Sequence, residues 1–165
     1  MEIRLAGISD IEQIDAIYNQ AIELQMATAD TKPYPWEKRL KWFNDHTPEE
    51  FPVYVAEIEG SVIAYFSLSP YRPGREALKY AVEISYFIEE KFRGRGIGSL
   101  MMESALKIAV ELGYRDVIAI LLGHNRASIG LLEKFGFERW GVMPGIAEFD
   151  GKKFDHLYYG KKLRE

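Results

Sequence analysis

Apolar side chains recur at helical spacing in four stretches of the chain. In the first stretch, residues 11–22, apolar positions fall three or four apart, and Ser9 with Glu12 fits a capping box at its start. The other stretches that predict helices are residues 36–43, about 96–112 and 127–135.

Short apolar or alternating runs bounded by turn residues predict the strands. These runs cover residues 2–6, 53–58, 62–68, 83–88 and 117–122, and a final hairpin turns at Asp150 and Gly151. Taken in chain order, these elements predict an α/β fold in which helices cover both faces of a mixed sheet.

Length and composition narrow the fold and its partners. With 165 residues, of which 47% are hydrophobic, we expect one domain spanning residues 1–165 with a sizeable core. The net charge is −4 and no block of Lys or Arg occurs, so the chain lacks the electrostatic footprint of a protein that binds nucleic acid or an anionic membrane. Zero cysteines exclude disulfides, thiolate nucleophiles and thiolate metal sites. We therefore expect a small molecule as the main partner.

Two further patterns bear on location and on metals. The first five residues lack the apolar core of a signal peptide and no apolar run approaches membrane-spanning length, so we expect a cytoplasmic protein. His46, His124 and His156 lie far apart in the sequence and form neither a His-x-His nor a His-Glu-x-x-His pattern. We therefore expect no metal site.

A glycine-rich turn follows the run at residues 83–88. Three glycines alternate with other residues between Arg93 and Ser99, at the start of the long helix. The first N–H groups of a helix lack intrahelical partners and lie at the positive end of its dipole, and glycines let a diphosphate approach the backbone. A P-loop is disfavoured because no lysine follows, and a dinucleotide-binding turn is disfavoured because Ser99 stands where the last glycine belongs. The turn therefore predicts a phosphate site of another kind.

Two motifs together resemble the GNAT superfamily of N-acetyltransferases. The first is Arg-x-x-Gly-x-Gly, carried by Arg93, Gly96 and Gly98 after a strand that contains Glu83. The second is an Asn before a short helix that ends in Gly-Phe, here at residues 125–137. The resemblance implies the acyl-CoA N-acyltransferase fold, whose mixed central sheet contains two neighbouring parallel strands that splay apart. It also implies acetyl-CoA as co-substrate, with no metal.

The resemblance assigns residues to the coenzyme. Along the exposed edge of the splayed strand, the pantetheine arm is expected to pair with the backbone of Tyr86, Phe87 and Ile88. The diphosphate is expected on Arg93, Gly94, Arg95, Gly96, Ile97, Gly98 and Ser99. In the second motif, the pantetheine or the acceptor side is expected to contact Asn125 and Ser128.

Glu83 is the predicted general base. An ammonium cannot attack a thioester, and a carboxylate at the splay point can take the proton directly or through a water, particularly where burial raises its pKa. The alternative is an outward-facing polar residue in an alternating strand, and the neighbouring motif favours the catalytic interpretation. Many family members place a tyrosine as general acid where this chain has Leu132, so we assign no general acid. Because the chain has no Cys and no Gly-x-Ser-x-Gly motif, direct transfer in a ternary complex is favoured over a covalent acyl-enzyme.

Within this family, the chain is most similar to the phosphinothricin acetyltransferase group. The likeness runs through residues 51–57, 75–83 and 154–156. It implies a small, amino-acid-like amine acceptor and a homodimer. The residues that it places at the acceptor, together with Glu83, are Arg72, Arg75 and Tyr80. For Arg72 a solvated surface position is an equal alternative.

Departures from that group indicate a different acceptor pocket. Leu78 stands where the group usually has an aromatic residue. The last segment of the group commonly has an aromatic residue followed two positions later by Asp, and Asp155 and His156 are displaced by one position from that pattern. Three further aromatics could either wall the acceptor site or belong to the core, and they are Trp36, Trp42 and Phe43.

Three classes of function therefore remain open. The favoured one is an enzyme that acetylates a small amino acid of the phosphinothricin, methionine sulfone or methionine sulfoximine type. The second is an enzyme that acetylates protein N-termini or lysines, which needs an open groove. The third is a non-catalytic acyl-CoA sensor, against which the presence of Glu83 argues.

Overall fold

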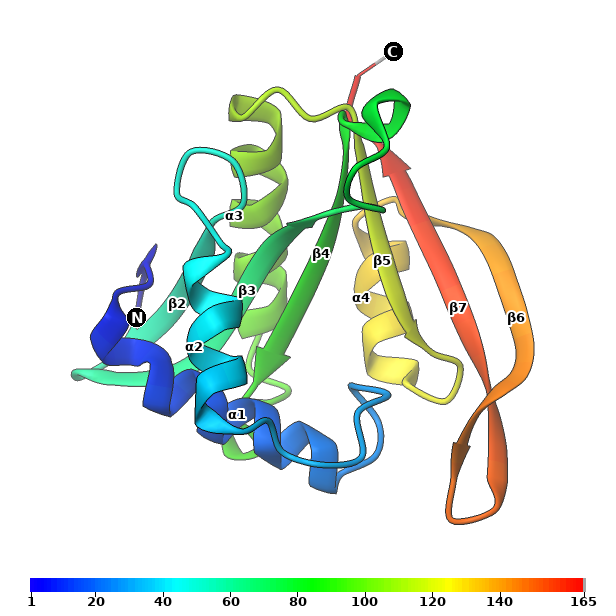
Figure 1. Ribbon diagram of the computed structural model, residues 1–165, viewed down its shortest axis with the longest axis horizontal. Helices are drawn as coiled ribbons and strands as arrows, with labels where there is room; N and C mark the ends of the chain where they lie inside the picture. The colour runs from blue at the N-terminus through cyan, green and yellow to red at the C-terminus, as the bar shows by residue number, and fades with distance from the viewer. Residues whose placement is uncertain (165) are drawn as a thin grey trace.

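The computed structural model describes residues 1–164 and contains a seven-stranded mixed sheet (Figure 1). The strands are β1 (Glu2–Leu5), β2 (Val53–Ile58), β3 (Ser61–Pro70), β4 (Ala81–Ile88), β5 (Asp116–Leu122), β6 (Glu138–Phe149) and β7 (Lys152–Lys162). The α-helices are α1 (Ile11–Glu23), α2 (Trp36–Asn44), α3 (Ile97–Glu111) and α4 (Arg126–Lys134). The predicted α/β fold class is confirmed, and each predicted helix and strand is present with its ends moved by at most two residues.

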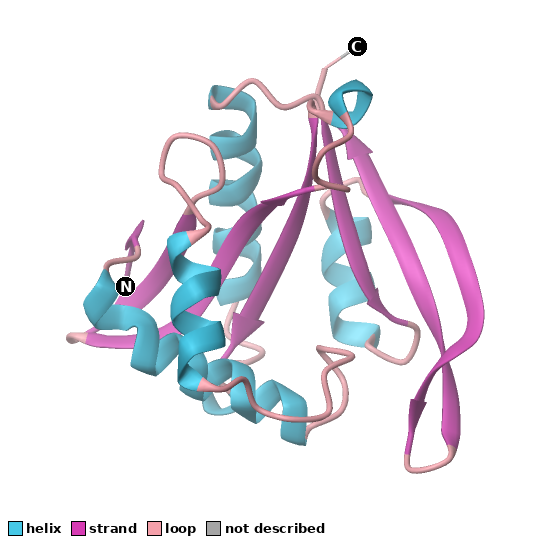
Figure 2. Ribbon diagram, viewed as in Figure 1, coloured by secondary structure: helices cyan, strands magenta, loops and turns pink. Residues whose placement is uncertain are grey.

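The sheet has the strand order β1-β2-β3-β4-β5-β7-β6, and helices cover both of its faces (Figure 2). Every neighbouring pair is antiparallel except β4 and β5, which are parallel. Helices α1 and α2 lie in front of the sheet in Figure 1, and α3 and α4 lie behind it. The parallel pair requires a crossover, which α3 supplies on the rear face.

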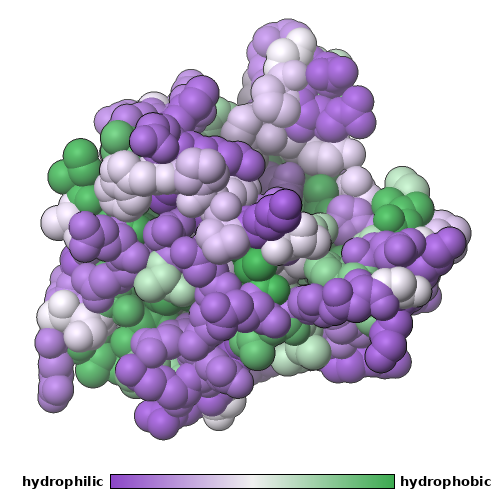
Figure 3. All heavy atoms as spheres, turned by 60° about the horizontal axis from the view of Figure 1, so that its bottom comes forward, coloured by the Kyte–Doolittle hydropathy of each residue, from purple (hydrophilic) through white to green (hydrophobic). Residues whose placement is uncertain are grey.

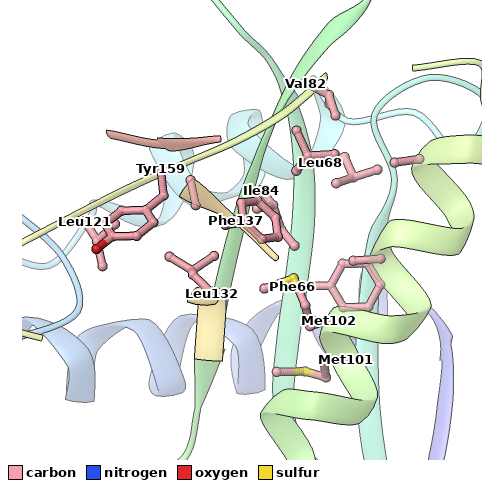
Figure 4. Packing of buried hydrophobic residues seen from close by; sticks show 14 of the residues in the cluster. Phe66, Leu68, Val82, Ile84, Met101, Met102, Leu121, Leu132, Phe137 and Tyr159 are labelled. Carbon is pink, nitrogen blue, oxygen red and sulfur yellow. The ribbon is translucent and has the colours of Figure 1, made fainter. Parts of the chain in front are cut away.

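Two apolar clusters hold these layers together. On the front face, Ile14 and Tyr18 of α1 pack with Val55 of β2. On the rear face, Met101 and Met102 of α3 pack against Phe66 and Leu68 of β3, as Figure 4 shows. Each face of β3 therefore contributes to a separate core, as expected for a strand with side chains alternating between two covered faces.

The parallel strands β4 and β5 separate partway along their length. Their pairing ends at Glu83 opposite Ile118, whereas β4 remains paired with β3 as far as Ile88 opposite Ala64. In Figure 1 the two strands start together at the top and diverge downward. The edge of β4 beyond Glu83 thus has backbone N–H and C=O groups without a neighbouring strand on that side. This is the splay that the family resemblance implies.

The start of α1 differs from its prediction. Ser9 and Glu12 do not form the capping box, because a 3₁₀ turn (Ile8–Asp10) precedes the helix. The box lies two residues earlier, where the Gly7 N–H donates to the Asp10 carboxylate at 2.7 Å. Asp10 is buried and also bridges to Arg4 of β1 at 2.8 Å. A tertiary ion pair therefore selects Asp10 over the local candidate.

The surface is mixed in character. Figure 3 shows hydrophilic side chains over most of one face, with apolar residues in small separate groups. Residues 1–164 contain no helix that combines the length and the hydropathy needed to cross a membrane.

Candidate active site

Glu83 lies at the point where β4 and β5 separate, on the wall of a cavity of about 370 Å³. Its partner on β3 is Ser69, which lines the same cavity, because residues opposite each other on neighbouring strands point to the same face. That face is the one covered by α1 and α2, which contribute Tyr18 and Trp42 to the wall. His156 of β7 closes the other side.

The surroundings of Glu83 suit a proton acceptor. The side chain is half-buried, and this burial raises the pKa of the Glu83 carboxyl above its usual value. Within residues 1–164 the carboxylate has no ion pair or side-chain hydrogen bond that would offset this effect. A carboxylate whose pKa moves toward neutrality is a stronger base at physiological pH than a solvated one.

A second cavity, of about 320 Å³, adjoins the first and extends along β4 to the glycine turn. The residues that line both cavities are Ala27, Tyr86, Phe87, Asn125 and Ser128. Of the residues predicted for the coenzyme, the second cavity is lined by Tyr86, Phe87, Ile88, Arg93, Gly94, Gly96, Gly98, Ser99, Asn125 and Ser128. The two cavities therefore adjoin, one reaching the glycine turn and the other Glu83.

Two predicted coenzyme residues do not line this cavity. Ile97 is buried in the rear core, so its contribution is limited to its backbone N–H in the first turn of α3. Arg95 is exposed, and its guanidinium lies over the Phe92 ring at 5.3 Å. Its side chain thus points toward the neighbouring 3₁₀ turn at Glu90–Phe92.

The glycines of the turn are required for two different reasons. Gly94 and Gly96 have φ angles of +72° and +80°, which L side chains rarely adopt, although a Cβ at either place meets no atom within 4 Å. At Gly98 the backbone is ordinary, but a Cβ lies 3.2 Å from Leu131 and 3.4 Å from Ile88. Glycine therefore shapes the turn at the first two positions and lets α3 approach α4 and β4 at the third.

The start of α3 has the features of an anion-binding helix N-terminus. No side chain caps the helix at Gly96, and no acidic residue lies in its first turn. Gly96, Gly98 and Ser99 line the second cavity at this helix end, where the helix dipole is positive, and the exposed Arg93 lines it as well. The Arg93 side chain is oriented by a hydrogen bond of 3.2 Å from Nε to the Ile88 carbonyl oxygen.

Asn125 and Ser128 have a structural task at the junction of the two cavities. Asn125 is the N-cap of α4, where its Oδ1 accepts a hydrogen bond from the Ser128 N–H at 3.1 Å. The Ser128 hydroxyl in turn pairs with the Tyr86 hydroxyl of β4. Burial raises the pKa of Tyr86 to about 12, so this phenol stays protonated at neutral pH. The pair therefore links α4 to the splayed strand and presents hydroxyl groups to the junction.

Leu132, which replaces the usual tyrosine of the family, lies inside the rear core. Figure 4 shows it extending from α4 toward Phe137. The side chain is fully buried and carries no proton donor. This position therefore cannot supply a general acid.

Arg72, Arg75 and Tyr80 lie elsewhere than expected. They line a separate cavity of about 630 Å³, between the β3–β4 connection and Tyr114, and Glu83 is not part of its wall. Within this chain, therefore, these three side chains do not share a cavity with Glu83, and their assignment to the acceptor stays a prediction. The reason is geometric, because the connection leaves β3 at the end where β4 and β5 are still paired, whereas the Glu83 cavity opens where they separate.

The cavity wall contains residues that the motifs did not identify. From helices α1 and α2 and their connection come Tyr18, Tyr34, Arg39 and Trp42, and β3 adds Tyr65. Of the three aromatics left open above, Trp42 lines the cavity, whereas Trp36 and Phe43 do not. The available signal was Arg39, a charged residue three positions before Trp42 on the apolar side of a helix.

The three histidines have separate surroundings, and His156 is the one that lines the Glu83 cavity. His46 pairs with the Trp42 carbonyl oxygen and with the Ser69 hydroxyl, and burial lowers its pKa. His124 pairs with the Gln25 carbonyl oxygen at 2.7 Å. Among the described residues, no group of three or more His, Asp or Glu side chains is arranged to hold a metal ion.

Known proteins resemble this chain in sequence and in structure. The model of the Acetyltransferase (GNAT) family matches residues 15–137. The chain is 46% identical to the Bacillus subtilis protein named "Putative phosphinothricin acetyltransferase YwnH", over 99% of each. It is 32% identical to the L-methionine sulfoximine/L-methionine sulfone acetyltransferase of Pseudomonas aeruginosa, over 93% of this chain and 89% of that one.

A solved structure extends the likeness to the fold and to the coenzyme. The phosphinothricin acetyltransferase of Sinorhizobium meliloti, in complex with acetyl-CoA, superposes with a TM-score of 0.93 at 29% identity. The match covers 98% of this chain and 88% of that one. The glycine turn, the splayed strands and these likenesses lead to one assignment. The chain belongs to the acetyltransferase (GNAT) family, and acetyl-CoA is its co-substrate.

Proposed function

We propose that this protein transfers the acetyl group of acetyl-CoA to the amine of a small, amino-acid-like acceptor, by direct attack in a ternary complex. The observation that carries the proposal is the pair of adjoining cavities, which share five lining residues and reach from the glycine turn to Glu83. It lets a coenzyme held by its diphosphate at α3 extend along β4 and bring its thioester to the wall that Glu83 shares.

The chain's own groups have distinct tasks in this reaction. The backbone edge of Tyr86, Phe87 and Ile88 holds the pantetheine arm, since it has no strand partner on the β5 side. The first turn of α3, with Arg93, holds the diphosphate. Acetyl-CoA supplies an activated acyl carbon and a thiolate leaving group.

Glu83 acts as general base. It takes a proton from the acceptor ammonium, directly or through a water, so that the nitrogen lone pair can form the new C–N bond as the C–S bond breaks. No general acid is assigned, because Leu132 lacks a proton donor and the thiolate of a thiol with a pKa of about 8.5 leaves readily. The chain has no cysteine, so direct attack replaces an acyl-cysteine route.

Two considerations favour a small acceptor over a protein. The cavity around Glu83 has a volume of about 370 Å³, which suits a metabolite rather than a peptide segment. The names of the relatives given above refer to phosphinothricin, methionine sulfoximine or methionine sulfone as the acceptor. These compounds are therefore the first acceptors to try.

The test is release of CoA thiol from acetyl-CoA in the presence of single acceptors. Methionine sulfone, methionine sulfoximine and phosphinothricin are compared with polyamines and with peptides that carry a free N-terminus or lysine. We expect at least one of the three amino acids to give the highest kcat/KM. A clear preference for peptides or polyamines would replace this proposal by the protein or polyamine alternative. Tight acetyl-CoA binding without turnover on any acceptor would point to a sensor.

A further inference from the structure

Arg39 is a buried charge on the wall of the Glu83 cavity. Its side chain is only 1% exposed. Arginine is almost never fully buried unless it is paired, so such a position requires an explanation. Part of the explanation is Asp15 of α1, whose Oδ1 accepts a hydrogen bond from Arg39 Nε at 2.7 Å.

That ion pair leaves donor capacity unused. A guanidinium has five N–H donors and matches a carboxylate with two parallel bonds, yet Asp15 engages Nε alone. The terminal Nη2 is buried and has no hydrogen-bond partner among residues 1–164. A buried donor without an acceptor is costly, and an arginine that served only to join α1 to α2 would be expected to satisfy it. The orphaned group lies on a residue that lines the cavity.

Aromatic rings hold the guanidinium in a fixed position. It lies 4.6 Å from the ring centroid of Tyr18, 4.6 Å from that of Tyr34 and 4.9 Å from that of Trp42. These contacts stabilise a cation without consuming its hydrogen-bond donors. They also exclude water, which strengthens an interaction with an anion in the same place.

The charges of the cavity are arranged as a pair. Of the described residues that line it, Arg39 and Glu83 are the Arg and the acidic residue, so they bring one basic and one acidic side chain to the same cavity. An amino acid carries one ammonium and one carboxylate. When the amine of the acceptor lies at Glu83, the acceptor's carboxylate can therefore interact with Arg39.

We propose that Arg39 is the specificity residue that binds the carboxylate of the acceptor amino acid. This inference rests on the proposed function. It assigns the acceptor's anion to the buried arginine of α2 and not to Arg72 or Arg75, which line the separate cavity.

The test compares an amino acid with its own α-carboxamide, which keeps the amine and the side chain and loses the negative charge. Methionine sulfone and methionine sulfone amide are such a pair. In Arg39→Met we expect the KM for the acid to rise roughly ten- to a hundredfold, as for loss of a charge-assisted hydrogen bond. The KM for the amide and the KM for acetyl-CoA should stay within about threefold. In Arg39→Lys, which keeps the charge without the planar fork, part of the preference for the acid should remain.

Two further variants separate recognition from folding. Lys41→Met removes an exposed positive charge from the same helix and should keep the acid-to-amide ratio of the wild type. The double variant Asp15→Asn/Arg39→Gln removes both charges of the ion pair, so no unpaired buried charge remains. It serves as the test protein if the single variant Arg39→Met does not fold. It should show the same collapse of the acid-to-amide ratio. A thermal melt of each variant checks that the fold is retained.

Several results would overturn the inference. One is an equal rise of KM for acid and amide in the Arg39 variants, which would assign Arg39 to packing alone. Another is a loss of the acid-to-amide preference in Arg75→Met while the Arg39 variants keep it. That result would assign anion binding to the β3–β4 connection. If the wild type acetylates neither acid nor amide but accepts peptides, the proposed function fails, and the inference fails with it. If the wild type acetylates both with equal kcat/KM, only the inference fails.

Discussion

At the scale of single residues, the site depends on groups whose surroundings oppose their ordinary behaviour. Glu83 is a carboxylate at a position where burial disfavours its charge. The guanidinium of Arg39 is buried in the cavity wall, and its Nη2 donor has no hydrogen-bond partner among the described residues. Both lie on the front face of the sheet, where no neighbouring strand or helix supplies a compensating partner for Glu83 or for Arg39 Nη2. Such uncompensated groups are typical of sites that complete their interactions with a ligand.

Replacing Glu83 tests its role as base. Glu83→Gln keeps the size of the side chain and should lower kcat by roughly 10²-fold or more, because general base catalysis is lost. Since burial raises the pKa of Glu83, kcat/KM of the wild type should increase with pH through a pKa above the ordinary carboxyl value. Steady-state rates at saturating acetyl-CoA, measured across acid to neutral pH, check both points.

The matched control for this substitution is Glu103→Gln on the exposed side of α3. It should leave the rate and the pH profile as in the wild type. Near-native turnover of Glu83→Gln at neutral and mildly acid pH would remove Glu83 from the mechanism. Loss of acetyl-CoA binding in Glu83→Gln would assign it a structural role.

At the scale of elements, the turn before α3 and the divergence of β4 from β5 shape the groove that we propose for the coenzyme. The turn depends on local backbone geometry, with Gly94 and Gly96 in the left-handed region. The divergence depends on pairing, since β4 stays on β3 while β5 turns to β7. A helix N-terminus and a free strand edge thus face the same groove.

A negative charge introduced into the glycine turn tests whether the turn binds the diphosphate. Gly96→Glu places a carboxylate beside the diphosphate site and should abolish the stabilisation by acetyl-CoA. In the wild type, acetyl-CoA at a hundredfold excess over Kd should stabilise the fold by about 2.7 kcal/mol. That corresponds to a rise in Tm of roughly 5–11 °C for a chain of this size. Thermal melts with and without saturating acetyl-CoA measure the difference.

Gly60→Glu is the matched control for Gly96→Glu. Gly60 has a similar φ of +79°, its Cβ position is equally open, and it lies in the β2–β3 turn away from the groove. It should destabilise the fold through the same backbone strain and retain the full shift with acetyl-CoA. Equal shifts in both variants would show that the diphosphate does not lie at the turn.

The sequence predicted most of these elements, and the exceptions have physical causes. Spacing and turn residues are local, so helices, strands and the glycine turn could be predicted without a structure. Ser9 failed as a cap because Asp10 gains a tertiary partner in Arg4. The surroundings of Arg39 come from residues 15 to 42, and nothing local shows that this arginine is buried. Arg75 and Glu83 line different cavities of this chain, because their distance in sequence does not show at which end of β4 each cavity opens.

At the scale of the whole molecule, two carboxylates have opposite effects on the stability of the fold. The charge of Asp10 stabilises it, whereas the charge of Glu83, the proposed base, destabilises it. Asp10 joins β1 to the start of α1, and its bond to Arg4 lowers the pKa of the Asp10 carboxyl. Its ionised form therefore stabilises the fold above the pKa of the unfolded chain, and that contribution is lost as pH falls through the lower folded pKa. For Glu83 the folded pKa is raised, so the neutral form is the favoured one in the fold. Its contribution is complete at acid pH and is lost as pH rises through the folded pKa.

These opposite signs predict opposite pH dependences for two isosteric variants. Glu83→Gln is neutral at every pH, so its free energy of unfolding should exceed that of the wild type at pH 7–8, and the difference should shrink toward pH 4. Asp10→Asn should be less stable than the wild type at pH 7, and its deficit should shrink as the medium becomes strongly acid. Urea denaturation of the three proteins at several pH values measures both trends. A Glu83→Gln variant less stable than the wild type at pH 7 would contradict this account, because it would mean that the Glu83 carboxylate contributes a stabilising interaction in the fold. The enzyme would then have no unfavourable buried charge for an incoming ammonium to relieve.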